Sequence, residues 1–165
     1  MKPVQLTDGT VILRPFTPDD AEAHLAGEDN EQIMWLSGGK STLEGVNDWI
    51  EKNQKHWEND GPVFTFAVSD ADQRLVGMVE ANTEYTKLEG RQAGDANISY
   101  GIYPKERGKG YATRAVTLIT DFLKDKGLKR AIIRVNPENT ESLKVPLRCQ
   151  FVEDGKVMTN DGETL

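Results

Sequence analysis

The sequence contains few of the residues that build covalent or metal-bound frameworks. Its 165 residues include a single cysteine, Cys149, and only two histidines, His24 and His56. One cysteine excludes an internal disulfide, and the histidines, the cysteine and the acids do not occur at the spacings of metal ligands. We therefore expect a protein without a metal site, suited to the reducing conditions of the cytoplasm.

Long apolar runs are absent, and positive charge is in deficit. Apolar residues make up 37% of the chain, but no run of them approaches the roughly 20 residues that cross a bilayer. Neither a transmembrane span nor a signal peptide is expected, and no membrane partner. The net charge of −7 argues against general nucleic-acid binding. At this length we expect one domain, residues 1–165, with a substantial core.

The most informative stretch is a strand, a glycine-rich turn and a helix within residues 97–127. Apolar residues first alternate with polar or small ones, the period of a strand, at Ile98, Tyr100 and Ile102. After the turn, apolar residues recur at helical spacing up to Leu123, and Gly127 stands where a C-terminal cap belongs. The N–H groups and the dipole of such a helix start favour an anion, and glycines let a ligand approach the backbone.

The turn itself is basic and consists of Arg107, Gly108, Lys109, Gly110, Tyr111 and Ala112. Its glycines could serve chain geometry alone. A dinucleotide-binding fingerprint does not fit, because Thr113 occupies the position of its last glycine and the next strand ends in Asn136 rather than an acid. A Walker phosphate loop does not fit either, since no Gly-Lys-Ser/Thr follows the required spacer. Neither nucleotide fingerprint explains the turn.

A third pattern does fit. The series Arg107-x-x-Gly110-x-Ala112, five residues beyond the strand, resembles the pyrophosphate-binding motif of the GCN5-related N-acetyltransferases. The segment Asn139-x-x-Ser142 looks like the start of the next cofactor-binding helix in that family. Both motifs occur in the family's order, so the resemblance is specific.

Two more segments extend the resemblance over nearly the whole chain. The ending Arg148-Cys149-Gln150-Phe151 resembles the end of that helix, and the opening Leu13-Arg14-Pro15-Phe16 resembles the branch that acetylates ribosomal-protein N-termini. The resemblance implies an α/β (α+β) fold, a mixed and mostly antiparallel central sheet with a splayed central strand, flanked by helices.

The resemblance also implies the chemistry. Acetyl-CoA is the expected cosubstrate, and a primary amine attacks its thioester directly in a ternary complex. The pantetheine arm is expected to pair with the central strand at Tyr100, Ile102 and Tyr103. The Ile102 N–H is the expected oxyanion donor.

Other residues receive roles from the resemblance in the same way. The N–H groups from Arg107 to Ala112 are expected to bind the pyrophosphate. Asn139 is expected to bind the pantetheine arm or the adenine-side phosphates. Ser142 is expected near the sulfur, where its hydroxyl can donate to the leaving thiolate.

Several assignments stay open. Glu80, near the end of a strand that faces the central one, could deprotonate the amine directly or through water, and a solvated strand-end carboxylate is the competing interpretation. We interpret His24 and His56 as surface residues and Cys149 as packed core. The acceptor is a protein N-terminus or a small-molecule amine. A non-catalytic acyl-CoA-binding or sensor module on the same fold is the alternative function.

Charge around the turn suits an anionic cosubstrate. Four cations stand against one acid, Glu106, which gives a local charge of +3; the cations are Lys105, Arg107, Lys109 and Arg114. The remaining acidity could favour a cationic acceptor, or it could be an ordinary solvated surface.

The flanking elements are predicted from turn and cap signals. A strand is expected at residues 10–14, followed by a helix that Thr17 caps and that weakens near Gly27. Ser41-x-x-Glu44 predicts a capping box at the start of the next helix. Residues 63–68 and 75–81 predict a hairpin, and residues 83–95 a loop.

The C-terminal part departs from the family pattern. Pro146 falls inside the cofactor-binding helix, where it removes a backbone hydrogen bond. Gln150 replaces the glycine expected at the helix end, so a left-handed cap there is strained. Strands are expected at residues 151–152 and 156–159, and the chain stops at Leu165, where the family's final strand should begin. An open sheet edge would favour a homodimer over a monomer.

Overall fold

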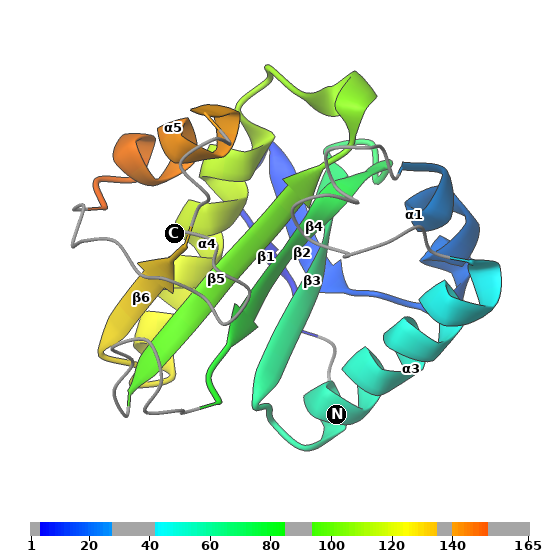
Figure 1. Cartoon of the computed structure of the whole chain (residues 1–165), viewed down its shortest axis with the longest axis horizontal. Helices are drawn as coiled ribbons and strands as arrows, with labels where there is room; N and C mark the ends of the chain where they lie inside the picture. The colour runs from blue at the N-terminus through cyan, green and yellow to red at the C-terminus, as the bar shows by residue number, and fades with distance from the viewer. Residues whose placement is uncertain (1–3, 28–41, 85–93, 135–139, 152–165) are drawn as a thin grey trace, which may run out of the picture.

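The order of strands in the sheet follows the chain. In the computed structural model, which describes residues 4–27, 42–84, 94–134 and 140–151, six strands lie side by side in sequence order (Figure 1). The strands are β1 (Leu6–Thr7), β2 (Val11–Pro15), β3 (Val63–Asp70), β4 (Leu75–Asn82), β5 (Asp95–Ile102) and β6 (Arg130–Ile133). Neighbours from β1 to β5 are antiparallel, and β6 pairs with β5 in parallel. The expected mixed, mostly antiparallel sheet and its central hairpin are confirmed.

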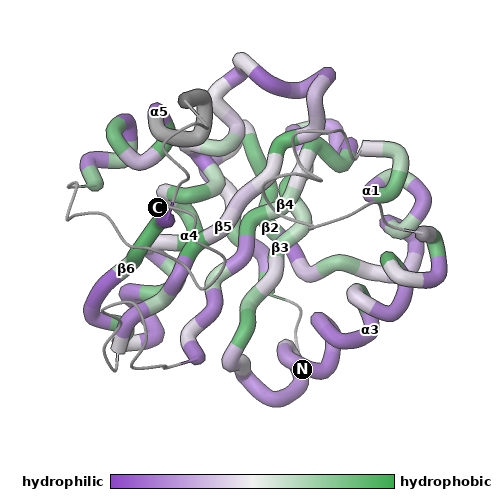
Figure 2. The backbone as a smooth tube through the Cα atoms, in the orientation of Figure 1, coloured by the Kyte–Doolittle hydropathy of each residue, from purple (hydrophilic) through white to green (hydrophobic). Residues whose placement is uncertain are grey.

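Helices cover both faces of this sheet. The described residues form η1 (Pro18–Asp20), α1 (Ala21–Gly27), α3 (Leu43–Glu58), η4 (Pro104–Glu106), α4 (Tyr111–Asp125) and α5 (Thr140–Arg148). One core cluster joins the sheet to α4 through Ala115, Val116, Ile119 and Leu123. A second cluster joins the other face to α1 and α3 through Ala21, Val46 and Ile50. Figure 2 shows α3 mostly hydrophilic, while hydrophobic residues concentrate on the strands that it covers.

The first helices begin with side-chain or backbone caps. The Thr17 N–H donates to Asp20 Oδ2 over 2.8 Å at the start of η1, and α1 follows and is described as far as Gly27. The N-cap of α3 is Thr42, whose Oγ1 accepts from the Gly45 N–H over 3.1 Å. The prediction of Ser41 as the cap was therefore wrong by one residue. An N-cap oxygen must reach the N–H three residues later, and the helix starts at Leu43.

The helix after the glycine-rich turn ends as the sequence predicts. The Gly127 N–H donates to the Lys124 carbonyl over 3.0 Å, and the Leu128 N–H donates to the Leu123 carbonyl over 3.1 Å. Gly127 has a φ of +86°. These two hydrogen bonds around a left-handed residue form a Schellman motif.

The last described helix, α5, ends with the same motif without a glycine. The Gln150 N–H donates to the Leu147 carbonyl over 3.2 Å, and the Phe151 N–H donates to the Pro146 carbonyl over 2.9 Å. Gln150 has a φ of +64°, so the expected strained cap is confirmed. Pro146 lies inside the helix, also as expected.

The central strands β5 and β6 diverge. Their parallel register runs from Asp95↔Arg130 to Ile98↔Ile133 and ends there, four residues before β5 ends. An ion pair of 2.6 Å between Arg130 Nη2 and Asp95 Oδ2 holds the paired end. Among the described residues, no strand pairs with the second half of β5 on the β6 side, as expected for a splayed central strand. The strands predicted at residues 151–152 and 156–159 lie outside the described residues, apart from Phe151, which is not in a strand.

Candidate active site

The glycine-rich turn places a set of backbone N–H groups at the start of α4. Within the described residues, the N–H groups of residues 108–113 donate to no acceptor; the first bond runs from the Arg114 N–H to the Gly110 carbonyl over 3.2 Å. Gly110 is the N-cap and supplies no side-chain oxygen, and the first turn of α4 contains no acid. The helix start therefore keeps the donors and the positive dipole end that bind an anion.

Both glycines of the turn are required by backbone conformation. Gly108 has a φ of +81° and Gly110 a φ of +80°, in the left-handed region. A Cβ placed at either glycine meets no atom of the described residues within 4 Å, so this part of the chain leaves space beside the turn. The Arg107 N–H donates to the Pro104 carbonyl over 3.4 Å. The run of available N–H groups thus begins at Gly108, one residue later than expected.

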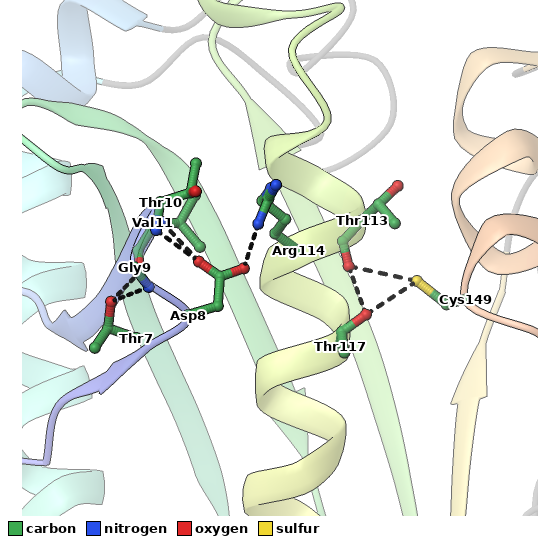
Figure 3. A network of polar contacts seen from close by, with 9 residues as sticks. All are labelled: Thr7, Asp8, Gly9, Thr10, Val11, Thr113, Arg114, Thr117 and Cys149. Carbon is green, nitrogen blue, oxygen red and sulfur yellow. Dashed lines mark hydrogen bonds and ion pairs between the residues drawn. The ribbon is translucent and has the colours of Figure 1, made fainter.

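Among the cations counted around the turn, Lys109 and Arg114 are paired with acids. Lys109 Nζ lies 2.9 Å from Glu106 Oε2. Arg114 Nη1 lies 2.9 Å from Asp8 Oδ2, a pair that Figure 3 shows. Burial opposes ionisation of Asp8, but hydrogen bonds from the Val11 and Thr10 N–H groups and from Arg114 outweigh it and lower its pKa. Asp8 lies outside the turn, and its pairing with Arg114 lowers the local charge below +3. This long-range contact cannot be read from the sequence of the turn.

At the end of β5, the N–H group of Ile102 points toward the side on which β6 diverges. The Tyr103 N–H donates to the Val76 carbonyl of β4 over 2.9 Å. In an antiparallel ladder successive residues alternate in direction, so the adjacent Ile102 directs its N–H and C=O away from β4. The Ile102 carbonyl accepts from Arg107 Nε on that side over 2.9 Å. The Ile102 N–H accordingly points toward the side on which β6 diverges, and by the same alternation so does that of Tyr100.

Glu80 lies within β4, on the face covered by α3. Its register partners are Thr65 of β3 and Ser99 of β5. The side chain is half-buried, and no hydrogen bond to its carboxylate forms within the described ranges. Burial raises its pKa, while the nearby charges of His56 and Lys52 partly oppose the rise. A partly desolvated carboxylate with a raised pKa is suited to accept a proton near neutral pH.

His24 was expected at the surface, and that interpretation was wrong. Its Nδ1 lies 2.6 Å from the Tyr103 hydroxyl, and its ring stacks on Trp49 at 4.8 Å. The Tyr103 ring also packs on Gly27, where a Cβ would lie 2.5 Å from Tyr103 Cδ1. The end of β5 is thus fastened to α1 by a tyrosine beside the proposed oxyanion donor. The 79-residue separation left no local sequence signal for this contact.

The predicted residues on α5 are only partly described. Asn139 lies outside the described residues, and Ser142 is placed by its backbone alone. Cys149 holds α5 beside α4, with its Sγ 3.5 Å from the Thr113 carbonyl oxygen and 3.8 Å from Thr117 Oγ1 (Figure 3). Burial raises the pKa of its thiol, which fits the expected packing role.

The described part of the chain contains no group of three or more His, Cys, Asp or Glu side chains arranged to hold a metal ion. None of its helices is both long and apolar enough to cross a membrane.

Comparisons with known proteins agree with this geometry. The probable N-acetyltransferase YjcK of Bacillus subtilis (strain 168) is 27% identical over 158 residues, which cover 92% of this chain and 85% of that protein. A putative ribosomal-protein-serine acetyltransferase from Vibrio cholerae has a TM-score of 0.79 at 23% identity, covering 99% and 97% of the two chains. The aminoglycoside acetyltransferase AAC(6′)-Ib, solved with coenzyme A, has a TM-score of 0.77 at 18% identity, covering 94% and 91%. At these identities the solved structures show a shared fold.

The family assignment comes from the sequence. Residues 10–152 match the family model described as the acetyltransferase (GNAT) domain. This match spans strands β2 to β6, the glycine-rich turn and both helices that follow it. The chain therefore belongs to the GNAT acetyltransferase family.

Proposed function

We propose that this protein transfers the acetyl group of acetyl-CoA to a primary amine by direct attack in a ternary complex. The observation that carries the proposal is the start of α4, where residues 108–113 offer N–H groups without a described acceptor and without a capping side chain. Coenzyme A is strongly anionic at its pyrophosphate, and this helix start supplies the matching donors. The open space above Gly108 and Gly110 lets the phosphates approach the backbone.

The remaining steps are assigned to residues around the splay. The Ile102 N–H, directed away from β4, donates to the oxyanion that develops on the thioester carbonyl. Tyr100 and Ile102, whose N–H groups point away from β4, border the pantetheine arm. The expected backbone pairing at Tyr103 is corrected, because its N–H donates to Val76 and its carbonyl accepts from the Glu106 N–H. Glu80 accepts the amine proton, directly or through water, because burial raises its pKa toward neutrality. From the family resemblance, Asn139 binds the cosubstrate and Ser142 donates to the departing thiolate.

The acceptor is a primary amine of a protein N-terminus or of a small molecule. The solved relatives include a putative ribosomal-protein-serine acetyltransferase and an aminoglycoside acetyltransferase, so the fold accommodates both acceptor classes. The acidic chain favours an acceptor that carries additional positive charge. We place the reaction in the cytoplasm, with the protein acting as a monomer or a homodimer.

Thermal unfolding with acetyl-CoA tests the cofactor site. At a concentration about 100-fold above Kd, a ligand stabilises the folded state by roughly 2.7 kcal/mol, or about 5–10 °C in Tm at this size. The variant Gly110→Val should lose this shift. Gly127→Val is the matched control, since Gly127 has a similar positive φ and open Cβ space but lies at the other end of α4. Undiminished binding by Gly110→Val would place the pyrophosphate elsewhere.

Release of free CoA thiol across a panel of amines tests catalysis. An enzyme releases CoA only with its acceptor class, whereas a non-catalytic acyl-CoA sensor shows the thermal shift and no turnover. The sensor is the competing function because it would need the same turn and helix start. Turnover with any primary amine, abolished by Gly110→Val, excludes it.

A further inference from the structure

We propose that Glu106 is a positioning residue that fixes the anion-binding turn by holding Lys109 away from the bound phosphates. The inference rests on the proposed function and deepens it. Glu106 belongs to η4, directly before the turn, and is 6% exposed although it is charged. One buried carboxylate engages two cations from different parts of the chain, so it needs a structural explanation.

The contacts of Glu106 join the turn to the β3–β4 hairpin. Its Oε1 lies 2.6 Å from Arg74 Nη1, and its Oε2 lies 2.9 Å from Lys109 Nζ. Arg74 Nη2 also donates to Oε2 over 3.0 Å. The hydrogen bond from Lys109, followed by the charges of Arg74 and Lys109, lowers the pKa of Glu106 and keeps it ionised.

The far end of this connection is anchored in turn. Arg74 Nε donates to Asp70 Oδ2 over 3.2 Å, and Asp70 Oδ1 accepts the Arg74 N–H over 2.9 Å and the Asp72 N–H over 3.0 Å. The hairpin therefore presents Arg74 in a fixed position. A continuous series of polar contacts runs from Asp70 through Arg74 and Glu106 to Lys109, and so to the turn.

This arrangement decides how the turn binds an anion. With Lys109 Nζ engaged by Glu106, the backbone N–H groups of residues 108–113 remain as donors for the phosphates. An isolated carboxylate three residues before Lys109 would repel phosphate, but the cations Arg74 and Lys109 balance the acids Asp70 and Glu106, so the series carries no net charge. Lys109 thus acts through Glu106 as a brace for the turn.

Because the partners of Glu106 are half-exposed, we expect its contacts to affect the geometry of the turn more than the stability of the fold. The side chains of Arg74 and Lys109 are 59% and 48% exposed, and solvent screens ion pairs of such residues. We expect Glu106→Gln and Lys109→Ala to leave Tm within about 2–4 °C of the parent. The effect should fall on acetyl-CoA binding, because displaced N–H groups lose their alignment with the phosphates.

The test is a double-mutant cycle on the acetyl-CoA site. Glu106→Gln and Lys109→Ala should each raise Kd and KM for acetyl-CoA about tenfold with little change in kcat. The Kd of the double variant should not exceed that of the single variant that binds acetyl-CoA less tightly. Lys55→Ala, which removes the exposed Lys55–Glu51 pair on α3, is the control and should change neither. Tighter binding by Glu106→Gln with weaker binding by Lys109→Ala would make Lys109 a direct ligand and overturn the proposal. Unchanged Kd in both variants would overturn it as well.

A second measurement is independent of the proposed function. In the ligand-free protein, ¹⁵N order parameters of residues 108–110 should fall in Glu106→Gln toward the values of flexible loops, below about 0.6. They should not fall in Lys55→Ala. Unchanged order parameters would refute the brace even if acetyl-CoA were not the ligand. Failure of the proposed function shows instead as a parent protein whose Tm does not respond to acetyl-CoA.

Discussion

The ends of α4 and α5 allow a reciprocal test of backbone strain. Both helices end in a Schellman motif, with the left-handed position taken by Gly127 in α4 and by Gln150 in α5. A residue with a Cβ costs about 1–2 kcal/mol in this conformation, of which part is returned because glycine loses more chain entropy on folding. We expect Gln150→Gly to raise the free energy of unfolding by about 1 kcal/mol, or roughly 2–4 °C in Tm.

The opposite exchange gives the matched control. A Cβ at Gly127 meets nothing within 4 Å, so Gly127→Gln adds strain without a clash. It should lower the free energy of unfolding by about 1 kcal/mol, and the double exchange should nearly restore the parent value. Additivity is expected because Cys149 contacts α4 at Thr117, ten residues or about 15 Å from Gly127 along the helix.

Urea unfolding followed by circular dichroism measures both variants. The midpoint should move up for Gln150→Gly and down for Gly127→Gln, with an unchanged m-value, because the surface exposed on unfolding is the same. A lower midpoint for Gln150→Gly would refute the reasoning. It would mean that contacts of the Gln150 side chain outweigh the strain of its backbone.

Two further predictions concern the catalytic face. Glu80→Gln should lower kcat/KM about a hundredfold. In the parent, kcat/KM should fall as pH drops through the raised pKa of Glu80, at a higher pH than for an ordinary glutamate, and the variant should lack this limb; a pH profile of CoA release decides, and an unchanged limb assigns the base elsewhere. Gly27→Ala should destabilise the fold by about 2 kcal/mol in urea unfolding, because its Cβ would overlap the Tyr103 ring; an unchanged midpoint would show that α1 is loosely docked on β5.

Local patterns predicted the elements well, because they are set by neighbours in the chain. The alternation of Ile98, Tyr100 and Ile102 became β5, and the helical spacing after the turn became α4 with Gly127 at its cap. The cost of a non-glycine at the end of α5 was also predictable, since the φ required at Gln150 follows from the motif. The Ser41 cap shows the limit of this reasoning, because the adjacent Thr42 offers the same chemistry one residue later.

The parts that failed depend on contacts between distant residues. His24 looked like a surface histidine because its sequence neighbours are polar, yet Tyr103 and Trp49 bury one side of it. The charge of the turn was overcounted because Asp8, 106 residues away, pairs with Arg114. The i, i+3 spacing of Glu106 and Lys109 could have revealed one ion pair, but nothing local pointed to Arg74.

These contacts bear on how a chain of net charge −7 can hold an anion at all. Net charge acts through solvent and is screened over about 8 Å at physiological salt, whereas backbone N–H groups act at contact. Two of the cations near the turn are engaged by Glu106 and Asp8. On the proposed function, the backbone N–H groups at the start of α4 are the donors that bind the anion. The acidity of the rest of the chain remains available to attract an amine of opposite charge.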